Sequence, residues 1–237
     1  PQDGQMVVEG YASGMDDEAN YYETNISQSF TVHQPVINLS ANPEVFSPSI
    51  SSVELSYEFS PLGTEQENAT ITSKIVDSNS NTIKTFEENS TKQPGTYTFT
   101  WDGKNDSGDT VPDGTYRFVV IVSSETKNVK YEIDIKLDSQ GPQITSYYPE
   151  DGSIIENPDC NIYANFTDSS GVNLSECQFF LDGEDLTSSA DWSATSFSYF
   201  TMVSEESHTA RLILKDNVGN TTDFTWSFEM KDYPQIW

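Results

Sequence analysis

Short runs in which apolar and polar residues alternate recur along most of this chain. Three examples are Val53–Phe59, Tyr97–Trp101 and Tyr131–Leu137. Gly, Pro, Asn and Asp bound these runs, and turn chemistry returns every ~8–12 residues. Alternation with a period of two is typical of strands that have one face in a core and the other in water. Because no stretch keeps apolar residues at helical spacing over three turns, the pattern predicts an all-β fold built from antiparallel β-sandwiches.

Two breaks in this pattern divide the chain. One lies just before Pro35, and the other lies in a short linker that contains Gly141 and Pro142. A chain of 237 residues is long enough for two domains that each have their own core. We therefore expect an N-terminal β-hairpin segment in residues 1–34, a first domain in residues 35–138 and a second domain in residues 139–237.

A hairpin pattern is repeated three times along the chain. Residues 114–137 and 207–230 each read as two strands that close a sandwich, and residues 5–33 follow the same plan. The third hairpin has no preceding strands to pack against, and an isolated two-stranded hairpin is only marginally stable in water. Three explanations stay open. The segment is the tail of a truncated domain, a pair of added strands, or strands donated to a neighbouring subunit.

The charge balance narrows the range of partners. With 38 acidic and 11 basic residues, the formal net charge is -27. Such a surface repels nucleic acid and anionic lipid and attracts cations, so we expect no nucleic-acid partner. The acidity either solvates the surface or recruits divalent ions. The longest apolar run, Phe118–Val122, is far shorter than a membrane helix, so we expect no membrane insertion.

Several features favour export. Eight Asn-X-Ser/Thr sequons lie in segments that read as turns or strand ends, which predicts glycosylation sites on an extracellular surface. The eight acceptors are Asn25, Asn38, Asn68, Asn89, Asn105, Asn165, Asn173 and Asn220.

The two cysteines point in the same direction. Cys160 and Cys177 flank a pattern that reads as a hairpin folded around Asp168-Ser169, and symmetric pairing places them opposite each other. This arrangement favours a disulfide in an exported chain. Buried free thiols are the alternative, and no CxxC motif supports redox or metal chemistry.

Two groups of acidic residues are candidate Ca²⁺ sites. The first lies in one turn, for which the alternative is a solvated loop with glycines at positive φ: Asp102, Asp106, Asp109 and Asp113. The second is spread along the sequence around the expected domain joint, where an ion would stiffen the linker: Asp138, Asp168, Asp216 and Asn217.

The sequence contains no recognisable catalytic constellation. Its two histidines, His33 and His208, lie in separate modules within strand patterns. No HExxH, GxSxG, P-loop or GxGxxG motif occurs, and paired carboxylates identify no glycosidase site in so acidic a chain. We therefore expect no catalytic residues and no enzymatic activity. Trp101 and Trp226 close alternating strands and are expected in the cores.

One stretch resembles a known family. A strand that ends in Trp101-Asp102-Gly103 is followed by a polar turn and by Val111-Pro112-Asp113-Gly114-Thr115-Tyr116, a pattern similar to the FlgD-like immunoglobulin domain. The resemblance covers about residues 36–137. About residues 138–230 resemble a more generic microbial immunoglobulin-like repeat, of the kind built in series in archaeal and bacterial surface layers, filaments and adhesins. Neither resemblance implies catalytic residues.

These observations predict a structural subunit of an extracellular filament, sheath or surface layer, assembled through β-sandwich contacts or strand complementation. Its expected partners are copies of itself, with other surface proteins or glycans as further partners. No cofactor is required by this reading, although Ca²⁺ is compatible with it. The alternative is an adhesin fragment or a carbohydrate-binding accessory module of a larger secreted protein.

Overall fold

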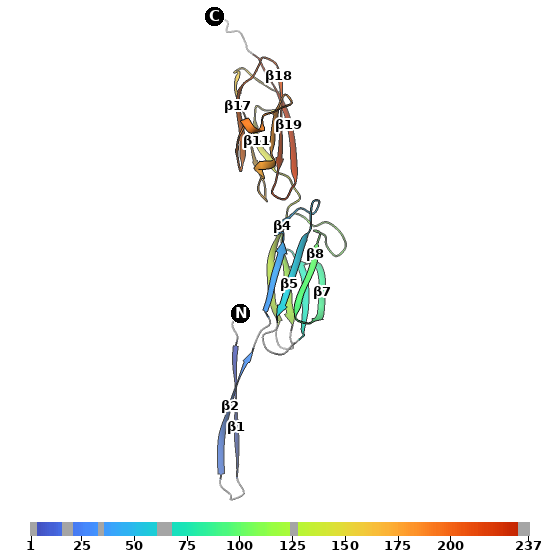
Figure 1. Ribbon diagram of the computed structural model, residues 1–237, viewed down its shortest axis with the longest axis vertical. Coiled ribbons are helices and arrows are strands. Elements are labelled where there is room, and N and C mark those ends of the chain that lie inside the picture. Colours follow the sequence, from blue (N-terminus) through green and yellow to red (C-terminus); the bar gives the residue numbers. More distant parts are fainter. Residues whose placement is uncertain (1–3, 16–20, 33–35, 61–67, 124–127, 232–237) are drawn as a thin grey trace.

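The computed structural model describes residues 4–15, 21–32, 36–60, 68–123 and 128–231. Nearly all regular structure within these ranges is β-strand, and the sheets follow one another along the long axis (Figure 1). The expected all-β fold is confirmed. The helical segments of these ranges are two single short turns, and neither is long and apolar enough to cross a membrane.

The N-terminal hairpin forms a sheet of its own. Strand β1 (Gly4–Met15) pairs antiparallel with β2 (Tyr21–Val32) in a continuous register, from Gly4 opposite Val32 to Met15 opposite Tyr21. The predicted pairing in residues 5–33 is therefore confirmed, while residues 16–20 between the two strands and His33 fall outside the described residues.

Strands β3 to β10 form the first sandwich. One sheet has the order β4-β10-β9-β6-β7 and the other the order β3-β5-β8. The strands are β3 (Val36–Asn42), β4 (Val45–Phe46), β5 (Val53–Ser60), β6 (Ala69–Val76), β7 (Thr82–Lys92), β8 (Gly95–Trp101), β9 (Gly114–Ser123) and β10 (Asn128–Leu137).

Alternation builds the core of this sandwich. Along β5, Val53, Leu55, Tyr57 and Phe59 are buried between exposed or half-exposed neighbours. Trp101 is buried as predicted, and its indole Nε1 donates a hydrogen bond of 2.9 Å to the carbonyl oxygen of Lys104. A buried indole that keeps a hydrogen-bond partner adds apolar area to the core without an unsatisfied donor.

Strands β11 to β19 form the second sandwich. Its sheets have the orders β11-β13-β17-β16 and β12-β19-β18-β14-β15. The strands are β11 (Gln143–Tyr148), β12 (Ser153–Ile155), β13 (Asp159–Thr167), β14 (Gln178–Leu181), β15 (Glu184–Asp185), β16 (Asp191–Ser193), β17 (Ser196–Met202), β18 (Ser207–Lys215) and β19 (Thr221–Met230). Trp226 is buried in this core, as expected.

The closing hairpins of both sandwiches follow the predicted pattern. Strand β9 pairs antiparallel with β10, and β18 pairs antiparallel with β19. In each sandwich a short early strand also pairs in parallel with the closing strand, β4 with β10 and β12 with β19. In each sandwich the second strand in chain order therefore lies beside the last one.

The hairpin expected around the cysteines is wrong. Strand β13 pairs with β11 and β17, which places Cys160 opposite Thr201. After β13 the chain forms the short turn η1 (Leu174–Glu176) and crosses to β14 in the opposite sheet, so Cys177 lies at the start of that sheet. Val172 and Leu174 alternate with polar residues, but this alternation stops at Ser175 and Glu176, and residues 174–176 form η1 in place of a returning strand.

The expected disulfide is also absent. Cys160 and Cys177 are both free and buried in the core of the second sandwich. The thiol of Cys177 donates a hydrogen bond of 3.4 Å to the carbonyl oxygen of Asn173. Burial raises the pKa of both thiols, because a thiolate is poorly solvated in an apolar core.

Candidate metal centre between the two sandwiches

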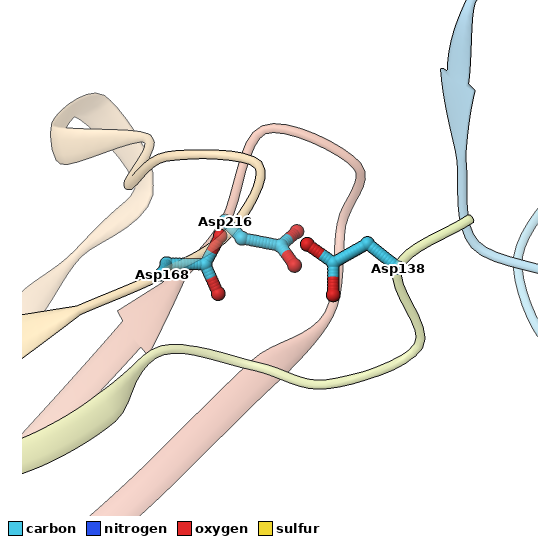
Figure 2. Close-up of side chains that lie close together, drawn as sticks. All are labelled: Asp138, Asp168 and Asp216. Carbon is cyan, nitrogen blue, oxygen red and sulfur yellow. The ribbon is translucent and has the colours of Figure 1, made fainter. Parts of the chain in front are cut away.

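Three aspartates from distant parts of the chain meet where the two sandwiches join. Asp138 follows β10, Asp168 follows β13 and Asp216 follows β18, so each is the first residue after a strand. One carboxylate oxygen from each lies within 4.8 Å of those from the other two. Figure 2 shows Asp168 and Asp216 side by side, with Asp138 facing them from the linker. We call these three residues the acidic cluster.

Burial makes the acidic cluster electrostatically unusual. The exposed fraction is 2% for Asp138 and 1% for Asp216, while Asp168 is partly exposed. Like charges this close repel one another, and burial removes the water that would screen them. Among the ion pairs of the described residues, none involves a carboxylate of the cluster. The ammonium of Lys136 is bonded nearby, to the carbonyl oxygen of Ser169.

Local turns hold the second-sandwich carboxylates in place. Oδ1 of Asp216 accepts hydrogen bonds from the backbone N–H groups of Val218 at 2.9 Å and Asn220 at 2.8 Å. Oδ1 of Asp168 accepts from the backbone N–H and the hydroxyl of Ser170, at 2.7 and 2.8 Å. Such turns fix the direction of each side chain before any ligand arrives.

Asn220 links the two sandwiches across the joint. Its Nδ2 donates to the carbonyl oxygen of Asp138 at 2.9 Å and to Oδ2 of Asp216 at 2.7 Å. Its Oδ1 accepts from the hydroxyl of Ser47 in the first sandwich at 2.7 Å. Ser47 is fully buried and Asn220 is 7% exposed. The side-chain amide thus has partners at both of its polar atoms.

Close packing reinforces this joint. Oδ1 of Asp113 in the first sandwich accepts from the backbone N–H and hydroxyl of Ser139 at 3.0 and 2.7 Å. Gly141 lies so close to β19 that a Cβ there would stand 2.8 Å from the backbone carbon of Thr221. A groove of about 490 Å³ separates the β3–β4 turn from the loop around Asn217. The linker is therefore anchored on both sides.

The fourth residue expected at this centre plays a different role. Asn217 is exposed, and its Nδ2 donates to the carbonyl oxygen of Ser170 at 2.9 Å. It braces the two loops that carry Asp168 and Asp216 against each other. The sequence therefore identified the three carboxylates that converge, and Asn217 lies beside them.

The other predicted calcium site is wrong. The carboxylates of Asp102, Asp106, Asp109 and Asp113 do not form a group among the described residues, and each has its own partners. Asp106 accepts from the backbone N–H of Thr85 and lies 3.6 Å from Lys84. Because the turn spreads its side chains outward, this acidic stretch is a solvated loop with glycines at positive φ, at Gly103 and Gly108.

The sequons differ in accessibility. Asn25 lies in β2, where only the backbone is described. Four acceptors are exposed, Asn38, Asn68, Asn89 and Asn165, and two are partly exposed, Asn105 and Asn173. Asn220 is wrong as a glycan acceptor in the folded chain, because its Nδ2 is buried and already donates two hydrogen bonds. Glycosylation at the remaining positions stays a prediction.

Sequence reasoning missed the roles of Asn220 and Ser47. The spacing of Asp216 and Asn220 within one turn signals a local side-chain cap, so the turn itself was recognisable. Nothing local to Ser47 points to a partner 173 residues away. Only the closed arrangement of the two sandwiches brings them together.

Comparison with known proteins supports the immunoglobulin-like character of the first sandwich. Residues 58–126 match the family model described as the FlgD Ig-like domain. The basal-body rod modification protein FlgD of Salmonella typhimurium is 35% identical to this chain over 66 residues, which are 27% of this chain and 28% of that protein. The protein of the same name from Salmonella typhi matches to the same extent. The match thus spans less than a third of these curated relatives.

Similar solved structures are more distant in sequence. The match to immunoglobulin domains 1–5 of Sidekick-1 covers 98% of this chain and 54% of that structure, with 11% sequence identity and a TM-score of 0.41. The match to a tetra-tandem repeat from the extending region of a large adhesion protein covers 97% of this chain and 57% of that structure, with 16% sequence identity and a TM-score of 0.39. The specific relationship is therefore the one in the first sandwich: this chain carries a FlgD Ig-like domain, found at residues 58–126.

Proposed function

We propose that this chain is a structural subunit of an extracellular filament, sheath or surface layer, built from copies of itself. The observation that carries this proposal is the buried joint between the sandwiches. A tether that leaves two modules independent needs only a polar linker, whereas Ser47, Asn220 and Asp138 form a buried network across this joint. A fixed angle between modules is what a repeating assembly requires.

Surface composition is compatible with this role. The net charge of -27 keeps the free subunit soluble and makes contact between copies dependent on screening by salt. Relatedness to a rod modification protein through the FlgD Ig-like domain agrees with a structural role outside the cell, since that domain is the shared part. We propose no catalytic role for the chain.

The acidic cluster gives this subunit a site for a divalent cation. Ca²⁺ takes six to eight oxygen ligands, and carboxylates are the strongest of these. Asp138, Asp168 and Asp216 offer three carboxylates that lie within 4.8 Å of one another, two of them buried. A bound cation would neutralise their repulsion and lock the linker to both loops. The joint would then be stiffest where the ion is available.

Concentration-dependent assembly tests the main proposal. The purified chain is studied by sedimentation velocity at rising concentration in about 0.15 M salt, where charge is screened beyond about 8 Å. Negative-stain microscopy of material from the native source provides a second view. We expect higher oligomers or ordered arrays, and monomers at every concentration and in the native material would contradict the proposal.

A specific surface favours a second candidate function, that of a binding module for glycans. The outer face of the sheet β11-β13-β17-β16 carries Tyr148 stacked on Tyr163, with ring centroids 6.0 Å apart. On the same face, Phe200 is 69% exposed and Met202 is 75% exposed. A monomeric chain whose retention on insoluble polysaccharide is lost with Phe200→Ala would replace the first proposal with this one.

A further inference from the structure

Among the described strands, none pairs with the N-terminal hairpin. Strands β1 and β2 form a two-stranded sheet and join none of the other sheets. Figure 1 shows the hairpin projecting from the end of the first sandwich that faces away from the second sandwich. Because two strands alone are marginal in water, a hairpin of 12 residues per strand would gain stability from pairing with a further strand.

Most sheet edges in the two sandwiches are protected against added strands. Strand β7 carries Lys84, Glu87, Glu88 and Lys92 and has three register irregularities against β6. In the second sandwich, β11 is bulged between Ile144 and Ser146, and the edge strands β12, β15 and β16 have at most three residues. Charges, bulges and short length are the usual devices that stop edge-to-edge pairing.

Strand β8 is an edge without such protection. Its seven residues, Gly95–Trp101, contain no charge, and its register with β5 is continuous. Thr96, Thr98 and Thr100 are exposed and alternate with Tyr97 and Phe99, a composition that favours strand pairing. Among the described residues, the backbone of β8 makes no hydrogen bond apart from its ladder with β5. Within the described residues, the N–H and C=O groups on the outer side of β8 are thus without a backbone partner.

The opposite edge of the same sheet is less open. Strand β3 is also uncharged, but its outer side faces β10. A groove of about 320 Å³ lies between them, lined on one side by Ile37 and Leu39 and on the other by Tyr131 and Ile133. Glu132 of β10 lines this groove as well, so an incoming strand would meet a charge there.

We propose that the β1–β2 hairpin of a second copy of this chain pairs with β8 and extends the sheet β3-β5-β8. At about 3.3 Å per residue, a hairpin strand spans roughly 40 Å and β8 roughly 23 Å, so one hairpin covers the whole edge. Each subunit carries one hairpin that precedes its first sandwich and one unpaired edge, β8, within that sandwich, which makes the contact head-to-tail and the assembly open-ended. This inference rests on the proposed self-assembly and names the surfaces that carry it.

Two variants of this 237-residue chain test the hairpin and the β8 edge separately. Thr98→Lys puts a charge on the edge at an exposed position, and Ile26→Pro interrupts the hairpin ladder. Gln178→Lys is the matched control, because Gln178 is exposed on β14, which is paired on both sides. Sedimentation velocity and negative-stain microscopy measure assembly, and circular dichroism confirms that each variant folds.

We expect Thr98→Lys and Ile26→Pro each to raise the concentration for half-maximal assembly by about tenfold or more, whereas Gln178→Lys behaves as the unmodified chain. A mixture of the two defective variants should form dimers and stop there, because one supplies the hairpin and the other the edge.

Assembly unchanged in both variants would overturn this inference while leaving the proposed function in place. Absence of assembly in the unmodified chain would overturn the proposed function itself. Assembly lost with Ile26→Pro but kept with Thr98→Lys would place the hairpin on another edge.

Discussion

Ser47 and Asn220 lie 173 residues apart in the sequence and are joined by a hydrogen bond of 2.7 Å, from the Ser47 hydroxyl to Oδ1 of Asn220. One residue belongs to the first sandwich and the other to the second, and both are buried. The bond therefore fixes how the two sandwiches meet. Since Asn220 also binds the linker at Asp138, one amide connects the first sandwich, the linker and the second sandwich.

Replacement of Asn220 by alanine should weaken the joint. Asn220→Ala leaves the Ser47 hydroxyl and Oδ2 of Asp216 without this partner in a buried site, which costs about 3 kcal/mol. Urea unfolding followed by tryptophan fluorescence measures the loss, and small-angle scattering should show a broader distribution of interdomain distances. Asn165→Ala is the control, because Asn165 is exposed and its loss should change stability by under about 0.5 kcal/mol. An equal effect of the two substitutions would remove the special role of Asn220.

Calcium should stabilise the chain through the acidic cluster. At a concentration of about 100 times Kd, a bound ion adds about 2.7 kcal/mol to the free energy of unfolding, and chelation removes this gain. Asp168→Asn should reverse the pattern: it stabilises the metal-free chain by reducing repulsion and abolishes the response to Ca²⁺. Differential scanning calorimetry with Ca²⁺ and with chelator measures both effects.

A matched acidic control makes the calcium result specific. Asp109→Asn lies in the exposed turn of the first sandwich and should keep the full response to Ca²⁺. A melting temperature of the unmodified chain that does not change with Ca²⁺ would refute a cation site at the joint. Equal loss of the Ca²⁺ response in Asp168→Asn and Asp109→Asn would refute it as well.

The two thiols should be unreactive in the folded chain. Cys160 and Cys177 are buried, and burial raises the pKa of both, so little reactive thiolate forms at pH 8. A thiol reagent should label neither residue in buffer and both in concentrated urea. Reduction should leave the melting temperature unchanged. An intact mass that lacks the two thiol hydrogens before reduction would contradict the free state.

The contact between His208 and Asp182 should make stability depend on pH. Nδ1 of His208 lies 2.7 Å from Oδ2 of Asp182, and Nε2 lies 3.0 Å from the carbonyl oxygen of Ser204. Burial alone lowers the pKa of this imidazole, but the two hydrogen bonds outweigh it and raise the pKa above 6.5. The contribution is therefore complete below about pH 6.5 and is lost as pH rises through the folded pKa.

Asp182→Asn tests this dependence without changing the shape of the side chain. We expect it to destabilise the chain by about 1 kcal/mol at pH 5.5 and to have little effect at pH 9. Urea unfolding at both pH values, compared with the unmodified chain, cancels the general effect of pH on so acidic a protein. A loss that is equal at both pH values would show that the histidine charge plays no role.

Most of the fold could be predicted from the alternation of apolar and polar residues along the strands. The buried positions of β5, the burial of Trp101 and Trp226, and the closing hairpins follow from a period of two and from turn residues, which are local signals. The cysteine hairpin failed because residues 171–177 were treated as a returning strand on symmetry alone. Local composition does not decide which of two sheets the chain enters next, since both sheets share one core.

The candidate site was only partly predictable. Asp138, Asp168 and Asp216 each follow a strand, and in a sandwich the strand ends gather at two poles, so their convergence was accessible to sequence reasoning. The Asn-X-Thr sequon at Asn220 is a local sequence pattern, and it predicts a glycan acceptor at this position. Its burial depends on Ser47 and Asp138, which only the docking of the second sandwich on the first brings near.

The parallel pairing of early and closing strands affects how the chain responds to tension. Once tension has passed β3 and β11, it pulls β4 and β10 in opposite directions along their length, and it pulls β12 and β19 in the same way. Hydrogen bonds across such pairs are loaded together and must rupture together, whereas those of an antiparallel hairpin pulled at its open end break in succession. Both sandwiches thus contain a parallel strand pair that tension along the chain would load in shear.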